Sequence, residues 1–232
     1  MSQKDYLGFA AEKLGVEFND IKLLETALTH RSWLNEHRKQ QGLEHNERLE
    51  FLGDAVLELS TTNYLFNEYD EPEGTLTNWR SALVRTESIG AAAEKLGFYD
   101  MVRMSRGERK SESERARLQM LANTFEAVIG AIYLDQGYDT ADQFIKRHIL
   151  STLDNILESG SWLDPKSHLQ ELAQAQTGDT PTYKVIEEDG PDHEKVFTVG
   201  VTISGKLMGK GSGPSKQSAQ QAAAKQALAN FK

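Results

Sequence analysis

Three acidic side chains, Glu47, Glu50 and Asp54, stand at helical spacing in one short segment. Positions i, i+3 and i+7 fall on one face of an α-helix, so the three carboxylates share that face. Like charges at this spacing repel each other, and a solvated acidic surface is the simplest explanation. Gly53 argues against it, because an interior glycine costs a helix about 1 kcal/mol relative to alanine. We therefore expect another backbone or a ligand to come close here.

A further carboxylate, Glu126, is the only charged residue in the apolar stretch 118–134. A helix that is apolar on nearly every side is buried, and a buried carboxylate is costly unless it is paired, neutralised or bound to metal. A salt bridge to Arg48 or Arg85 is one solution. The other is a metal site, since Asn123 adds an oxygen on the same face. Oxygen ligands from two helices suit Mg²⁺ or Mn²⁺.

The elements that carry these residues are predicted to be helical from Asp5 to about Leu157. Apolar residues recur at three- and four-residue spacing in segments 21–28, 47–65, 76–96, 118–134 and 141–157. In the second of these, a core-facing stripe is formed by Leu49, Leu52, Val56 and Leu59.

The hydrophobic period changes after a segment of small residues that ends in a helix-starting Asp-Pro. Residues 166–176 form a short helical pattern, 182–187 and 196–204 alternate like half-buried strands, and 205–213 hold a turn and a third short strand. An alanine-rich helix is expected over 219–231. The sequence predicts a multi-domain chain: an all-α domain over 1–158, a linker over 159–164 and a small α+β domain (α-β-β-β-α) over 165–232.

Composition gives a mixed indication of partners. The net charge is −9 and the pI is near 5.2, whereas nucleic-acid-binding domains are usually basic. All the excess acid lies in residues 1–160, because 161–232 carry eight residues of each sign. Phosphate chemistry in the first part would therefore need metal ions or local basic patches.

The chain contains no cysteine, which excludes disulfides, thiolate catalysis and sulfur-based zinc sites. No apolar run approaches the roughly 20 residues of a membrane span, and no signal peptide is evident. We expect a cytoplasmic protein without membrane partners.

The segment Asn-Glu-Arg-Leu-Glu-Phe-Leu-Gly-Asp-Ala-Val-Leu at 46–57 resembles the signature of the ribonuclease III family. The segments 27–32 (Ala-Leu-Thr-His-Arg-Ser) and 126–135 match as well. The similarity covers essentially the whole chain, and 165–232 resemble a double-stranded-RNA-binding domain. It implies a homodimeric endoribonuclease that needs Mg²⁺, with Mn²⁺ as a substitute, and no small-molecule cofactor. It also implies cleavage of double-stranded RNA to 5′-phosphate and 3′-hydroxyl ends with short 3′ overhangs, in rRNA processing and in mRNA maturation or decay.

The resemblance assigns roles to individual acidic residues. The metal ligands would be Glu50, Asp54, Asn123 and Glu126. The residues that act in catalysis would be Asp54 and Glu126, helped by two outer acids, Glu47 and Glu73.

Asn123 departs from the family pattern, because many members have aspartate there. Asparagine keeps a carbonyl oxygen but lacks the negative charge, so it binds a hard cation more weakly. A catalytically impaired RNA-binding protein on the same fold is therefore an alternative. The retained acids argue against it, and an unrelated metal-dependent hydrolase would not explain the second domain.

Two other residues of the first domain have competing interpretations. Phe51 corresponds to an aromatic that family members bury in the partner subunit, although packing inside its own subunit would fit the pattern equally well. His30 is interpreted as structural.

The second domain presents three regions for RNA. Ser167, Gln170 and Gln174 share an exposed helical face suited to minor-groove hydroxyls. His193 lies in a loop that resembles the second minor-groove probe. The segment 209–219 resembles a glycine-rich loop leading into a helix, where Lys210, Ser215 and Lys216 would meet phosphate at the helix N-terminus. The alternative is a simple strand-to-helix turn.

The basic charge of this domain is low for its family. Gln217 stands where a second basic residue is usual, so we predict weak, salt-sensitive RNA binding by the isolated domain.

Overall fold

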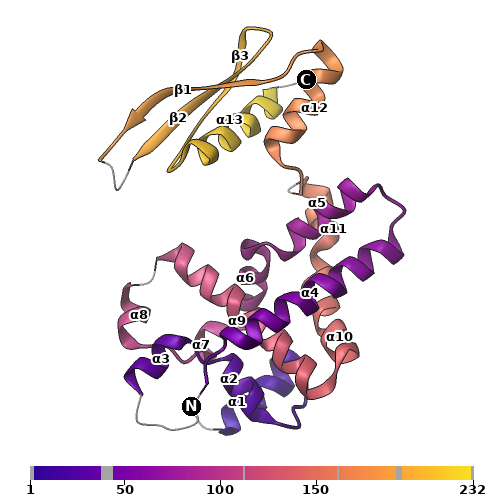
Figure 1. Cartoon of the computed structure of the whole chain (residues 1–232), viewed down its shortest axis with the longest axis vertical. Helices are drawn as coiled ribbons and strands as arrows, with labels where there is room; N and C mark the ends of the chain where they lie inside the picture. The colour runs from indigo at the N-terminus through magenta and orange to yellow at the C-terminus, as the bar shows by residue number, and fades with distance from the viewer. Residues whose placement is uncertain (1–2, 38–43, 112, 161, 192–194, 231–232) are drawn as a thin grey trace. The chain divides into compact units, whose positions relative to one another are not determined.

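The computed structural model describes residues 3–37, 44–111, 113–160, 162–191 and 195–230 (Figure 1). The chain divides into two compact units, Met1–Trp162 and Leu163–Lys232. The first is helical and the second combines helices with one sheet, which confirms the predicted fold class. Within the described residues, no helix combines the length and apolar character needed to span a bilayer.

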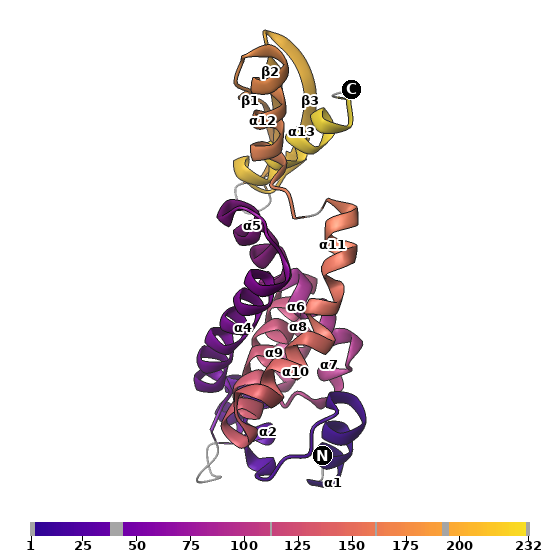
Figure 2. The ribbon, with the colours of Figure 1, turned by 90° about the vertical axis from the view of Figure 1, so that its right-hand side faces the viewer.

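The first unit consists of helices around one apolar core. In chain order these are α1 (Gln3–Phe9), a π-helical turn η1 (Ala10–Leu14), α2 (Ile21–Ala27), α3 (Arg31–Glu36), α4 (Glu47–Glu68), α5 (Glu73–Val84), α6 (Thr86–Lys95), α7 (Phe98–Met101), α8 (Arg106–Ser111), α9 (Glu114–Gln136), α10 (Tyr138–His148), a 3₁₀ turn η2 (Leu150–Thr152) and α11 (Leu153–Ser159). Helix α9 lies in the middle of this core and packs closely on α4 (Figure 2). Its burial follows from its nearly continuous apolar sequence.

Two segments with a continuous helical period are each broken into two helices. Between α5 and α6, Arg85 is extended, with φ −69° and ψ 153°. Helix α10 ends at His148, and η2 separates it from α11. The apolar spacing continues across each break because buried side chains, such as Leu83 and Ile89, lie on both sides of it. A change in the direction of the helix axis is therefore not visible in the spacing of apolar residues.

Helices α4 and α9 cross with their backbones in contact. A Cβ atom on Gly53 would overlap the carbonyl oxygen of Glu126, and one on Gly130 would overlap the carbonyl oxygen of Leu49. This confirms that Gly53 permits close approach of another backbone. The crossing places the peptide of Glu126 directly against the acidic segment of α4.

The second unit contains α12 (Pro165–Thr177), β1 (Thr182–Asp189), β2 (Val196–Ile203), β3 (Lys206–Gly213) and α13 (Lys216–Asn230). The strands form an antiparallel sheet in the order β1-β2-β3. Asp164 caps α12 by accepting a hydrogen bond from the Ser167 backbone N–H at 2.9 Å, as the Asp-Pro signal indicates. A small core joins α12 and the sheet to the alanine face of α13.

The third strand predicted within 205–213 is confirmed, and the glycine-rich segment 209–219 belongs mostly to this strand and to the helix after it, not to a loop. Gly209 and Gly211 lie in β3, where a Cβ atom on either would overlap the backbone of α13. Only Pro214 and Ser215 connect the strand to the helix, which begins at Lys216. The glycines therefore let the alanine-rich helix approach the sheet closely.

Candidate functional site

Glu50 and Asp54 on α4 and Glu126 on α9 meet at the crossing of the two helices. Glu50 and Glu126 are partly buried, whereas Asp54 is exposed. Because Gly53 contacts the peptide of Glu126, the three carboxylates share one electrostatic environment. The sequence placed Glu50 and Asp54 on one face; the fold adds Glu126 to it.

The buried carboxyl of Glu126 is strongly perturbed. Burial, followed by the charges of Asp54 and Glu50, raises its pKa to about 8. The pKa of Glu50 is also raised, first by burial and then by Glu47 and Asp54. No cation is among these causes, and no ion pair joins Glu126 to an arginine within the described residues. The result is a group of three neighbouring carboxyls that lacks a compensating positive charge among the described residues.

The donor set fits a hard divalent cation. Carboxylate oxygens are the ligands that Mg²⁺ and Mn²⁺ prefer, and a cation would relieve the repulsion that raises the pKa of Glu126. Within the described part of the chain, however, no three His, Asp or Glu side chains converge closely enough to hold a metal ion as they stand. The fit therefore rests on charge and ligand type, and binding would require side-chain movement.

Asn123 is held by a neighbour that the sequence reading missed. Its Oδ1 accepts a hydrogen bond from Gln119 Nε2 at 2.7 Å. The two residues are one helical turn apart on α9, so their i, i+4 spacing was the available signal. Gln119 orients an amide oxygen that adds no charge to the site.

The two outer acids lie in different places. Glu47 begins α4 and lies 3.2 Å from Arg31 and 3.8 Å from His45, and its charge reaches Glu50. Glu73 begins α5, where it accepts a hydrogen bond from Thr77 Oγ1 at 3.0 Å. Within its own subunit, Glu73 therefore does not join the other acids.

Glu73 instead lies beside the far end of α4. It lines a cavity of about 400 Å³ together with Leu65 and Phe66. With a helical rise of about 1.5 Å per residue, Leu65 stands roughly 20 Å along α4 from Glu50.

An apolar stripe on α4 faces outward. Phe51 is 81% exposed, Leu59 58% and Phe66 75%, and together these three residues define the α4 stripe. The alternative that Phe51 packs inside its own subunit was wrong, as was the placement of Leu59 on the core-facing side. Leu49 and Val56 are buried as predicted.

The polar residues expected to meet RNA lie on the surface of the second unit. Ser167, Gln170 and Gln174 are exposed along α12, and Ser215 and Lys216 are exposed at the start of α13. The N-terminal parts of these helices lie side by side, because Lys166 Nζ donates to Gln220 Oε1 at 2.7 Å. These five exposed residues are referred to below as the α12–α13 face.

Lys210 lies away from the α12–α13 face. Its neighbours Gly209 and Gly211 face α13, so strand alternation directs the Lys210 side chain to the opposite side of the sheet. His193 lies outside the described residues.

An acidic residue on β1 neutralises cations of this unit. Glu188 lies 3.5 Å from Lys195 Nζ and 3.4 Å from Lys216 Nζ. No local pattern in the sequence indicates the pair with Lys216, because β1 and α13 meet only in the folded unit.

Comparison with known proteins decides the family. Residues 20–153 match the family model described as Ribonuclease-III-like, and 165–231 match the double-stranded RNA binding motif. Ribonuclease 3 of Listeria monocytogenes is 43% identical over 221 residues, and that of Oceanobacillus iheyensis 45% over 218, each alignment covering 94% of both chains. The chain belongs to the ribonuclease III family.

Solved structures agree with this assignment for the first unit. The nuclease domain of ribonuclease III from Campylobacter jejuni aligns with a TM-score of 0.56 and 36% identity, covering 62% of this chain and 96% of that one. Dicer from Giardia intestinalis aligns at 22% identity with a TM-score of 0.51, covering 65% of this chain and 20% of that one, and shares the fold alone.

A ribonuclease III is an endoribonuclease that acts on double-stranded RNA, and both parts of that activity have a structural counterpart in this chain. The carboxylates lie in the region that matches the nuclease model, and the α12–α13 face lies in the region that matches the RNA-binding motif. The acidic net charge is therefore compatible with RNA chemistry, because it lies in the unit whose carboxylates suit a cation.

Proposed function

We propose that this ribonuclease III hydrolyses double-stranded RNA at a divalent-metal site held by Glu50, Asp54 and Glu126. Cleavage leaves 5′-phosphate and 3′-hydroxyl ends with short 3′ overhangs. The observation that carries the proposal is the pKa of Glu126, raised to about 8 beside two carboxylates. A buried carboxyl without a cationic partner is costly, and a bound cation would remove that cost.

The role proposed for each residue of the site follows from its burial and its neighbours. When bound, Mg²⁺ or Mn²⁺ supplies a bound water of lowered pKa and stabilises charge on the phosphodiester. Glu126 must lose its proton before it can bind a cation, so protons and metal compete for it. Asp54, which is exposed, faces the solvent from which substrate arrives. Asn123, oriented by Gln119, offers a neutral oxygen, and Glu47 adds negative potential at Glu50.

We also propose that the active form is a homodimer built on the α4 stripe. A cavity of about 670 Å³ lies beside Phe51 and is lined in part by Leu23, Leu49 and Leu134. In a two-fold dimer, the same patch meets itself, so each Phe51 can enter the cavity of the other subunit. The Campylobacter jejuni nuclease domain is described as having a region involved in dimer formation.

Dimerisation also gives Glu73 a role. Because Glu73 lies near Phe66 at the far end of the stripe, a two-fold pairing of the stripes carries it toward the Glu50 of the other subunit. Each cleavage site would then combine acids from both chains.

The α12–α13 face would hold the duplex. Hydroxyl and amide groups on α12 suit the 2′-hydroxyls of a minor groove, while Lys216 and Ser215 at the start of α13 suit phosphate. Lys210 and His193 stay predicted contacts. The proposed roles are rRNA precursor processing and mRNA maturation or decay, and a cytoplasmic location stays a prediction.

One cleavage assay tests the enzyme against a non-catalytic RNA binder. A long RNA duplex is incubated with the full chain in Mg²⁺, in Mn²⁺ and in EDTA, alongside Glu126→Gln and the control Glu114→Gln at the exposed start of α9. We expect cleavage that needs metal, is lost in Glu126→Gln and persists in the control. End-labelling should show 5′-phosphates.

Asn123→Asp adds a fourth carboxylate and should lower the Mg²⁺ concentration needed for half-maximal cleavage. If the wild-type chain bound the duplex but did not cleave it with either metal, the proposal would be disproved. The alternative of a catalytically impaired RNA-binding protein would then be favoured.

A further inference from the structure

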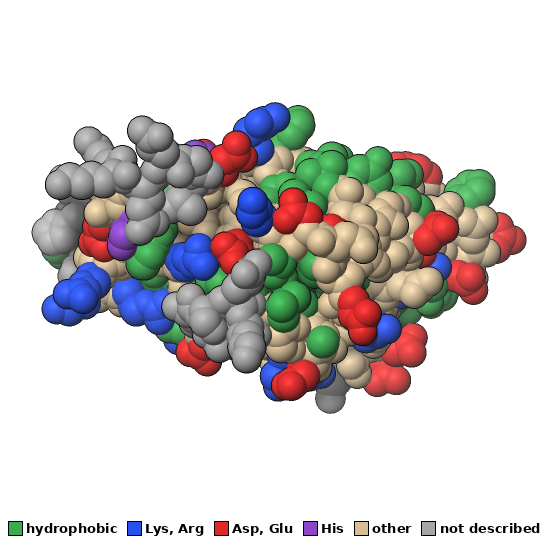
Figure 3. All heavy atoms as spheres, turned by 90° about the horizontal axis from the view of Figure 1, so that it is seen from below, with side chains coloured by type: hydrophobic (Ala, Val, Ile, Leu, Met, Phe, Trp, Pro, Cys, Tyr) green, Lys and Arg blue, Asp and Glu red, His purple; other side chains and the backbone are tan. Residues whose placement is uncertain are grey.

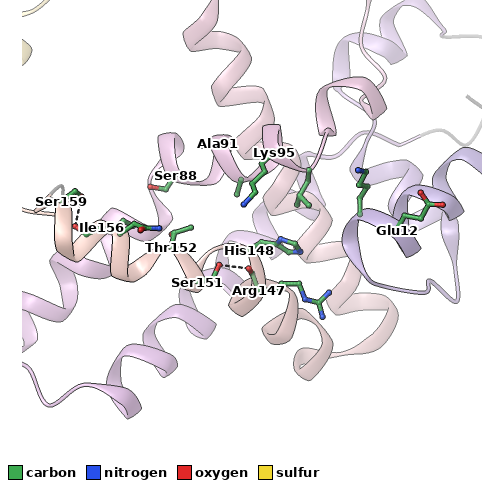
Figure 4. Close-up of a pocket in the computed structure, with 14 residues that line it drawn as sticks. Glu12, Ser88, Ala91, Lys95, Arg147, His148, Ser151, Thr152, Ile156 and Ser159 are labelled. Carbon is green, nitrogen blue, oxygen red and sulfur yellow. Dashed lines mark hydrogen bonds between the residues drawn. The ribbon is translucent and has the colours of Figure 1, made fainter.

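A cavity away from the acidic site gathers cations at three helix ends. It has a volume of about 660 Å³, and η1, α6, α10, η2 and α11 of the first unit line it (Figure 4). Lys13, Lys95 and Arg147 line it, each in the last turn of its helix, and Glu12 is the one acid of the lining. Figure 4 shows Lys95 on α6 and His148 on α10 beside this space.

Two cations of this cavity, Lys95 and Arg147, have no acidic partner in the part of the chain that the structure describes. Elsewhere in the unit, cations such as Arg31, Arg80 and Arg117 pair with glutamates, and Figure 3 shows acidic and basic side chains interleaved on the face seen there. Among the described residues, no carboxylate lies within ion-pair distance of Lys95 or Arg147. Among the described lining residues, Glu12 alone offsets this positive charge, although the sequence of the first unit is acidic.

The side chain of Arg147 lies against the end of η1. Gly15 ends η1 with φ 67°, and a Cβ atom there would overlap Nη1 of Arg147. The guanidinium therefore packs against a residue with no side chain. The neighbouring His148 lies in the positive potential of these cations. Its pKa is lowered first by burial and then by the charges of Arg147 and Lys95. Its Nε2 is buried without a hydrogen-bond partner among the described residues.

The remaining walls offer apolar surface and hydrogen-bond acceptors. Ala91, Ala92, Leu96 and Ile156 form the apolar part. Ser151 and Thr152 donate their hydroxyl protons to the carbonyls of Arg147 and Ile149 at 2.7 and 2.6 Å. Their oxygens can then only accept, so they suit ligand hydroxyl or amino groups rather than phosphate.

We propose that this cavity binds a small phosphorylated ligand of nucleotide size, with its phosphates on Lys95, Arg147 and Lys13. Arginine matches phosphate with two parallel hydrogen bonds, and three cations favour a polyanion over a single charge. The volume lies in the range of small-ligand sites, about 300–1,000 Å³. This inference stands apart from the nuclease site.

Binding of adenosine diphosphate to the full chain tests the proposal. Titration calorimetry in EDTA excludes metal-bridged binding at the carboxylates, with inorganic pyrophosphate as a second probe. The wild-type chain should bind one ADP. The Lys95→Gln/Arg147→Gln variant should bind about tenfold more weakly or worse, the loss expected for a charge-assisted hydrogen bond.

Lys146→Gln is the matched control, because Lys146 is in the same last turn of α10 but pairs with Asp142 at 2.8 Å outside the cavity. It should bind ADP as the wild-type chain does. All three proteins should cleave duplex RNA at the same rate.

Three results would overturn the proposal. The first is that neither probe binds and that the double variant is less stable than wild type. The cations would then only stabilise the C-terminal ends of their helices. The second is equal binding by wild type and double variant. The third is weakened duplex RNA binding in the double variant without any ADP binding, which would assign these cations to the RNA.

Discussion

At the scale of single residues, the proton on Glu126 links acidity to stability. Its pKa is 4.5 when unperturbed and about 8 in the fold. Between these values the folded chain keeps a proton that the unfolded chain has lost, so the free energy of unfolding falls as the pH rises. Below 4.5 both states are protonated, and above 8 both are ionised.

We therefore expect the metal-free chain to lose stability from pH 5.5 to pH 8 by more than Glu126→Gln does. Urea unfolding in EDTA at several pH values measures this difference. Added Mg²⁺ should reduce the wild-type loss, because a cation binds the ionised carboxylate. If the free energy of unfolding depended on pH in the same way in both proteins, the pKa of Glu126 would not be raised in the fold.

Residue-level prediction from the sequence worked where chemistry follows local spacing. Glu50 and Asp54 were recognisable because a helical period places them on one face. Glu126 was recognisable because its neighbours are apolar. Glu188 was not, since its partner Lys216 comes from a distant element and a strand of mixed polarity marks no acid as special.

At the scale of elements, the crossing of α4 and α9 depends on a missing side chain. Gly53→Ala places a methyl group on the backbone of Glu126, and such overpacking costs about 1–3 kcal/mol or more. Because the two backbones cannot move apart, we expect the free energy of unfolding to fall by an amount at or above the upper end of that range. We also expect loss of cleavage. Urea unfolding measures the first.

Gly74→Ala is the control, because nothing lies within 4 Å of a Cβ there. It should leave the free energy of unfolding within about 1 kcal/mol of wild type. Equal effects of the two substitutions would contradict the backbone contact.

Glu188 limits the charge that the second unit offers to RNA. Removing its charge with Glu188→Gln frees Lys216 and Lys195 from an acidic neighbour. We expect tighter binding of duplex RNA in EDTA and a salt dependence steeper by about one unit of log K against log salt. Fluorescence anisotropy across a salt series measures both.

The adjacent Glu187→Gln removes the same charge from a residue with no ion pair among the described residues. It should leave the slope unchanged. A slope shared by both variants would mean that Lys216 is already available to phosphate.

Element boundaries were predictable only where the period or a breaker changes. Asp164 and Pro165 mark the start of α12, whereas Arg85 carries no breaker signal although the helix ends there. The strand over 205–213 was predicted, but its glycines also resembled a loop, because a residue without a side chain has no alternation to read. Their function became visible only when α13 was placed against them.

At the scale of the whole molecule, the proposed association through the α4 stripe would set the active form. Phe51→Ala removes an 81% exposed aromatic ring from the proposed interface, and buried aromatic anchors dominate such contacts. We expect a shift from dimer to monomer, and reduced cleavage because Glu73 would lose its opposite site. Sedimentation equilibrium reports the mass.

Leu7→Ala, at an exposed apolar position on α1 outside the stripe, should stay dimeric. A wild-type chain that is monomeric at micromolar concentration, or a dimeric Phe51→Ala, would disprove the interface. The two-unit organisation was predictable because the hydrophobic period changes after the first unit. The exposure of Leu59 was not, since Leu59 shares the spacing of the buried Leu49 and Val56, whereas exposure of Phe51 was one of two alternatives that the sequence left open.

The glycine contact between α4 and α9 also fixes when this enzyme can begin to work. Glu50 and Asp54 leave the ribosome early, but Glu126 follows only after several further helices have been synthesised. Because α9 forms the centre of the core, the carboxylates cannot assemble on a growing chain until it has emerged and docked. An unfinished chain that lacks α9 therefore carries only the α4 half of the proposed site.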